Sequence, residues 1–148
     1  MRDRSAPTGP ATEDRPSDAS RGAGVILVAL YAVLALAATG RSVVQLTESF
    51  DEAPLAYLLS AVAAVIYCVA TVAIARHGAL SRRVAIIACS IELVGVLVVG
   101  AASYAVPEAF PHKTVWSHFG SGYGYVPLVL PVLGLWWLSR RAVAVTTD

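Results

Sequence analysis

Long apolar segments separated by short polar tracts constrain this chain more than any other feature of its sequence. Residues 54–75 and 84–106 each form a run of about 22 residues with almost no charge. At a rise of about 1.5 Å per residue, a helix of that length spans a hydrocarbon core of about 30 Å. Residues 24–40 form another such run, which continues toward Leu46. The pattern predicts an all-α membrane protein, and the charged content of 14% agrees, since soluble domains carry roughly 25%.

A fourth apolar run, residues 126–138, is too short to cross a bilayer, because as a helix it would cover only about 20 Å. We expect the crossing to recruit the preceding tract, and we expect a bend at a proline deep in the run. Irregular backbone survives at membrane depth only where protein or a water-filled cavity covers it. Two interpretations therefore stay open: a kinked, closely packed helix start, or the wall of a polar cleft open to the outside. The glycines and prolines of this broken-helix segment are Gly120, Gly122, Gly124, Pro127 and Pro131, of which Pro131 is the deep one.

Basic residues are distributed unevenly over the connections between these runs. Nine of the eleven Lys and Arg residues fall in the N-terminal tract, in the connection between the second and third runs, and at the C-terminus. Only Arg41 and Lys113 fall on the other side. Because Lys and Arg are retained in the cytoplasm, we predict a four-helix transmembrane bundle of the cytoplasmic membrane with both termini inside (N-in/C-in). Trp136 and Trp137 fit an inner aromatic belt, and Trp116 fits an outer one.

The boundaries of the apolar runs divide the chain into three parts. Residues 1–22 are rich in Pro, Ser, Thr, Asp and Arg, and such a tract cannot bury enough apolar surface to offset its ordering entropy. We expect residues 1–22 to form a disordered cytoplasmic tail. We expect residues 23–141 to form the four-helix transmembrane domain, and residues 142–148 to form a short cytoplasmic tail.

One acidic residue, Glu92, lies well inside an apolar run. A charge near the bilayer centre costs at least ~2.5–3.5 kcal/mol, and the small residues on the face of Glu92 mark helix–helix contact in membranes. We therefore expect Glu92 to face the bundle as a largely protonated, hydrogen-bonded acid. Tyr67 and Tyr31 lie at a similar nominal depth, and we predict a buried polar cluster of Glu92, Tyr67 and Tyr31 with Thr71 nearby. Such a cluster either fixes helix packing or forms a proton-binding or ligand-binding site, and both hypotheses stay open.

Other residues capable of chemistry lack the spacing of a known site. Glu108, His112 and His118 match no standard arrangement of metal ligands. Cys68 and Cys89 fall in apolar runs, and we expect both to be reduced, small core residues. We therefore predict no catalytic residue, no bound metal and no cofactor. The net charge of +1 gives no basis for nucleic-acid binding.

Two stretches carry a resemblance to known proteins. The stretch VWSHFGSGYGYVPLVLPVLGLWWL, residues 115–138, and the stretch DEAPLAYLLSAVAAVIYCVA, residues 51–70, resemble a group of small actinobacterial four-helix integral membrane proteins of unknown function. The resemblance covers residues 24–141 and implies a four-helix membrane fold, but it implies no activity.

The absence of catalytic motifs and the thin loops favour a non-enzymatic role. We predict an accessory or interaction subunit that contacts the lipid bilayer and either a membrane-protein partner or further copies of itself. The alternative is a small oligomeric transporter or channel that uses Glu92 and the Gly/Pro-broken fourth helix.

Overall fold

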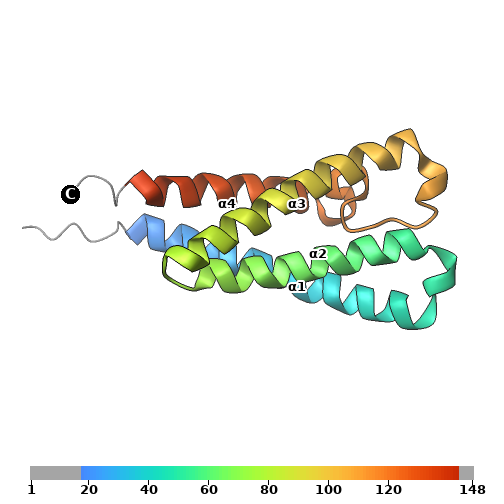
Figure 1. The fold of residues 1–148 in the computed structure, drawn as a ribbon, viewed down its shortest axis with the longest axis horizontal. Coiled ribbons are helices and arrows are strands. Elements are labelled where there is room, and N and C mark those ends of the chain that lie inside the picture. The colour runs from blue at the N-terminus through green and yellow to red at the C-terminus, as the bar shows by residue number, and fades with distance from the viewer. Residues whose placement is uncertain (1–17, 144–148) are drawn as a thin grey trace, which may run out of the picture.

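The computed structural model describes residues 18–143 as four long helices joined by short connections (Figure 1). The long helices are α1 (Asp18–Glu48), α2 (Pro54–Ala75), α3 (Ala79–Ala105) and α4 (Val126–Val143). The connections contain three short 3-10 helices, η1 (Phe50–Glu52), η2 (Pro107–Ala109) and η3 (Ser117–Tyr123). No strand occurs in this described part of the chain, so the predicted all-α fold is confirmed.

Three of these helices, α1, α2 and α3, are long and apolar enough to cross a membrane. The pair η3 and α4 provides a fourth crossing if the two bent parts count as one span. All four long helices also expose large apolar side chains on the outside of the bundle, among them Val33, Val65, Ile87 and Val129. A helix that is apolar on its inner and outer faces alike is typical of a membrane span.

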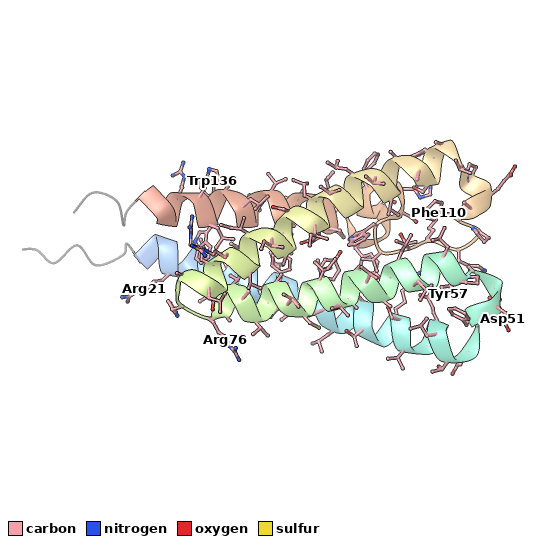
Figure 2. All side chains as sticks on the ribbon, viewed as in Figure 1. Arg21, Asp51, Tyr57, Arg76, Phe110 and Trp136 are labelled. Carbon is pink, nitrogen blue, oxygen red and sulfur yellow. The ribbon has the colours of Figure 1, made fainter. Side chains whose placement is uncertain are left out.

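Consecutive long helices run in opposite directions, so alternate connections lie at the same end of the bundle. The two ends of the bundle therefore differ in charge. Figure 1 shows the start of α1, the α2–α3 connection and the end of α4 at one end of the molecule. Arg21 and Arg76 lie at this end, whereas Asp51 lies at the opposite end (Figure 2). We call the end that carries Arg21 and Arg76 the basic end. Arg82 ties α3 to α4 there, because its Nε and Nη2 donate to the carbonyl oxygen of Leu138 at 3.2 and 3.1 Å.

The long helices extend beyond the apolar runs that predicted them. Helix α1 begins at Asp18, so residues 18–22 of the expected disordered tail are helical, while residues 1–17 lie outside the described residues. Helix α4 ends at Val143, two residues into the expected C-terminal tail, and residues 144–148 again lie outside the description. Once a helix has nucleated, each added residue gains a hydrogen bond, so its ends readily propagate into polar sequence.

The fourth crossing breaks at its start and not at Pro131, where a bend was expected. Helix α4 runs through Pro131 without interruption. The chain turns instead at Gly124 and Tyr125, which have positive φ angles of 63° and 61°, and η3 meets α4 at 97°. Because these left-handed residues already redirect the chain, α4 can continue straight after them.

Cys68 departs from its predicted place in the core. Cys89 is buried, whereas Cys68 is exposed, and both are free thiols. Cys68 follows the fully buried Tyr67 on α2, and adjacent helical positions differ by about 100° around the axis. Cys68 therefore faces outward, where the lipid would lie.

Candidate functional site

The interior of the bundle contains one acid, Glu92 of α3, paired with a phenol, Tyr31 of α1. Both residues are 0% exposed, and the Tyr31 hydroxyl donates to Glu92 Oε2 at 2.7 Å. The same hydroxyl lies 3.4 Å from the Sγ of Cys89, one turn along α3. These contacts join α1 to α3 across the centre of the bundle.

Helix α4 closes over this pair at a glycine. A Cβ atom at Gly134 would lie 3.1 Å from Cys89 Sγ and 3.7 Å from the Tyr31 hydroxyl oxygen. A glycine here lets the α4 backbone approach the cluster, as small residues do at helix contacts in membranes. Helix α4 therefore packs against the Tyr31 and Cys89 neighbours of Glu92, which is itself fully buried inside the bundle.

The second carboxyl oxygen of Glu92, Oε1, has no hydrogen-bond partner among the described residues. The contact between His112 Nε2 and Glu52 Oε2, at 3.6 Å, does not involve Glu92. A buried polar atom left without a partner costs about 1–3 kcal/mol, so the site contains one carboxyl oxygen whose hydrogen-bonding capacity is unused by the described residues.

Tyr67 of α2 completes a polar layer beside the Tyr31–Glu92 pair. Its ring packs against the ring of Tyr31 with centroids 6.3 Å apart and a tilt of 53°. Its hydroxyl oxygen accepts a hydrogen bond from Trp116 Nε1 at 3.0 Å. Thr71, which was expected near the cluster, lies one turn along α2 from Tyr67 and donates to its backbone carbonyl oxygen at 2.7 Å. Three of the four predicted residues thus share one layer, and the Thr71 hydroxyl satisfies its own helix.

Trp116 is a site residue that the sequence did not reveal, because it was expected in an aromatic belt at the membrane surface. It is 3% exposed, and its ring lies against α3 at Gly95. A Cβ atom at position 95 would come within 2.7 Å of that ring. Gly95 lies three residues after Glu92, on a neighbouring part of the surface of α3. A glycine beside a buried acid was the one signal in the sequence that a large side chain packs against α3 at this position.

The connection that carries Trp116 folds back into the bundle with its own hydrogen bonds. Ser117 Oγ accepts from the Thr114 backbone N–H at 2.9 Å, and Thr114 Oγ1 accepts from the backbone N–H groups of Trp116 and Ser117 at 3.0 and 2.9 Å. Ser103 of α3 accepts from the His118 backbone N–H at 2.8 Å. Side-chain hydroxyls thus replace water for a non-helical backbone, as a membrane interior requires.

The broken-helix segment is packed against protein on one side. A Cβ atom at Gly100 would meet the Phe119 ring at 2.5 Å, and one at Gly120 would meet the Pro127 ring at 2.8 Å. Pro127 and Pro131 are fully buried. The segment's other two glycines, Gly122 and Gly124, are exposed. This packing favours the closely packed interpretation of the segment over a polar cleft.

The structure separates His112 from His118. His112 lies 3.6 Å from Glu52 Oε2, whereas the His118 ring packs edge-on against Tyr104 with centroids 4.6 Å apart. No group of three or more His, Cys, Asp or Glu suited to a metal ion is found within residues 18–143. Arg41 is used structurally, because its Nη2 donates to the Lys113 carbonyl oxygen at 2.6 Å and ties the connection to α1.

The cluster around Glu92 therefore consists of a carboxyl, two phenols, a thiol and an indole, which can bind a proton and donate or accept hydrogen bonds. All four long helices and the folded-back connection contribute to it. Comparison of the chain with family models, with curated proteins and with solved structures found no match.

Proposed function

We propose that this chain is a non-enzymatic integral protein of the cytoplasmic membrane that serves as an accessory or interaction subunit, with both termini in the cytoplasm. The observation that supports it best is the use made of the buried polar groups. The Tyr31 hydroxyl donates a hydrogen bond to Glu92, and the Trp116 indole donates one to Tyr67. Each bond joins segments that are far apart in the chain. Interhelical hydrogen bonds of this kind hold transmembrane helices together, which is the use that an accessory or interaction subunit has for them.

The distribution of charge supports the proposed orientation. The start of α1, the α2–α3 connection and the end of α4 lie together at the basic end, which carries Arg21, Arg76, Arg82, Arg83 and Arg140. A basic end of this kind remains on the cytoplasmic side during insertion.

Native electrophoresis tests the interaction role. The tagged chain is expressed at its natural level in its own host and, separately, alone in a foreign host, and both membranes are solubilised in the same mild detergent. We expect a larger complex of fixed composition only in the first membrane. Migration as the same small species in both membranes would contradict the proposal.

A transporter or channel is the second candidate, and two observations favour it. Glu92 Oε1 lacks a hydrogen-bond partner among the described residues, and the fourth crossing is interrupted by a 97° bend between η3 and α4. Interrupted helices surround the binding sites of many transporters. Proton flux into proteoliposomes distinguishes the candidates: we expect none above empty liposomes, and a flux that Glu92→Gln abolishes would replace the first proposal with the second.

A further inference from the structure

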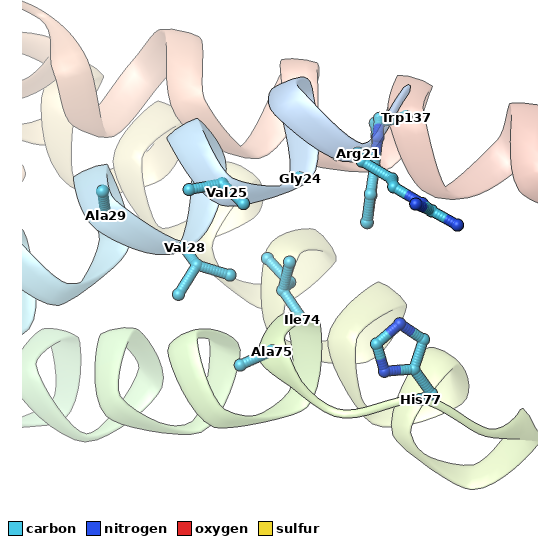
Figure 3. Close-up of a pocket in the computed structure, with 9 residues that line it drawn as sticks. All are labelled: Arg21, Gly24, Val25, Val28, Ala29, Ile74, Ala75, His77 and Trp137. Atoms are coloured by element: carbon cyan, nitrogen blue, oxygen red, sulfur yellow. The ribbon is translucent and has the colours of Figure 1, made fainter. Parts of the chain in front are cut away.

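A groove opens on the side of the bundle near the basic end, between α1, α2 and α4 (Figure 3). Its volume is about 590 Å³, within the range of about 300–1,000 Å³ for ligand-binding pockets. Its walls are apolar side chains of α1 and α2, including Val25, Val28, Ala29 and Ile74. Trp137 of α4 lies against α1 at Gly24, where a Cβ atom would come within 2.6 Å of its ring.

The polar side chains of the groove are gathered at one end of it. Arg21 and His77 lie beyond the apolar residues, toward the basic end (Figure 3). From Arg21 to Ala29 is eight residues, or about 12 Å along α1. The groove therefore has a polar mouth, formed by Arg21 and His77 toward the basic end, and an apolar trough that runs along α1 away from it.

No Asp or Glu is among the described residues that line the groove. Arg82 and Arg140, at the same end, are engaged elsewhere: Arg82 donates to Leu138, and Arg140 lies over the Trp136 ring at 4.1 Å. Among the described lining residues the charge therefore comes from Arg21 on α1, and the imidazole of His77 after α2 adds a hydrogen-bonding group at the same end of the groove.

We propose that this groove binds one anionic glycerophospholipid, with its phosphate at Arg21 and His77 and one acyl chain along Val28 and Ile74. The bilayer supplies this ligand directly, because the trough opens on the lipid-facing side of the bundle. A cationic mouth above an apolar trough complements a lipid that is negative at one end and apolar along its length. The proposal needs the chain to be embedded in a membrane, but it does not depend on the accessory role.

Native mass spectrometry of the full chain tests the site, with phosphatidylglycerol and phosphatidylcholine of identical acyl chains as the two probes. We expect one phosphatidylglycerol to be retained in preference to phosphatidylcholine, and Arg21→Gln to reduce that preference by about fivefold. This factor corresponds to ~1 kcal/mol for one basic residue near an anionic surface. The control is Arg83→Gln, which removes an exposed arginine at the same end but outside the groove, and it should leave the preference unchanged.

A second pair of variants tests the trough by bulk alone. Ala29→Phe places an aromatic ring in the groove at an exposed position, so the fold should tolerate it, and we expect retention of both lipids to fall. Ala37→Phe adds the same bulk at an exposed position of the same helix outside the groove and should have no effect. Three results would each overturn the proposal: equal retention of the two lipids, an equal loss in Arg83→Gln and Arg21→Gln, or unchanged retention in Ala29→Phe.

Discussion

The Tyr31–Glu92 hydrogen bond should be measurable as a coupling energy between two helices that are not neighbours in sequence. Tyr31→Phe removes the donor and leaves Glu92 Oε2 unpaired, whereas Glu92→Leu removes the acceptor and leaves the Tyr31 hydroxyl with only the weak 3.4 Å contact to Cys89. Interhelical hydrogen bonds measured in membranes average ~0.6 kcal/mol and reach ~1.7 kcal/mol. This bond is 2.7 Å long between fully buried groups, so we expect a value in the upper half of that range.

A double-mutant cycle isolates this energy from the other effects of each substitution. The free energy of unfolding of the wild type, the two single variants and the double variant is measured in mixed micelles by titration with a denaturing detergent. The double variant Tyr31→Phe/Glu92→Leu should be more stable than the sum of the single losses implies, because it leaves neither partner buried alone. We also expect Glu92→Gln to lie within about 1 kcal/mol of the wild type, since its amide oxygen still accepts from Tyr31.

Thr71 provides the matched control for this cycle. Its hydroxyl donates to the backbone carbonyl of Tyr67 on its own helix, and the hydrogen bond to Glu92 comes from Tyr31. Thr71→Val and Glu92→Leu should therefore be additive within about 0.3–0.5 kcal/mol. A Tyr31–Glu92 coupling energy no larger than the Thr71–Glu92 coupling energy would show that the hydrogen bond from Tyr31 does not stabilise buried Glu92.

Two further predictions concern the packing of Trp116, and a third concerns the orientation of the termini. Trp116→Phe removes the donor of the 3.0 Å bond to Tyr67 and should lower the free energy of unfolding by ~0.6–1.7 kcal/mol in the same detergent titration; no loss would place the indole elsewhere. Gly95→Val should destabilise by about 1–3 kcal/mol and shift tryptophan emission to the red as the Trp116 ring is displaced, whereas Gly40→Ala, with open space around it, should do neither. Fluorescent-protein and phosphatase fusions at each terminus should report a cytoplasmic location for both, and phosphatase activity at either terminus would reverse the orientation.

The helix positions and the inward face of Glu92 followed from the sequence because both depend on local pattern. Helix α2 matches its predicted bounds, Pro54–Ala75, since Pro54 suits a first helical turn and a polar Arg-His-Gly stretch follows the last apolar residue. Glu92 lies on a face of small residues, and that face proved to be the buried one.

The fold-back of Trp116 could not be predicted in the same way, because it depends on contacts between distant segments. Thr114 and Ser117 look like residues of a polar surface loop, yet here they satisfy the backbone of a buried turn. The hydrogen-bond partner of Thr71 could not be predicted either. Thr71 shares the face of Tyr67, but its short side chain reaches its own helix more easily than a partner across the bundle.

Glu92 accounts for the arrangement of this bundle better than apolar packing alone. In a membrane, an apolar side chain is satisfied about equally by lipid and by a neighbouring helix, so apolar surface selects one arrangement of helices only weakly. An arrangement that turned Glu92 toward lipid would cost at least ~2.5–3.5 kcal/mol. At the depth of Glu92, Tyr31 of α1 donates a hydrogen bond to the acid, and Tyr67 and Trp116 form a second hydrogen-bonded pair beside it. Gly134 lets the α4 backbone approach the same layer. The acid therefore favours arrangements of helices that bring a hydrogen-bonding side chain to it, as the observed one does with Tyr31.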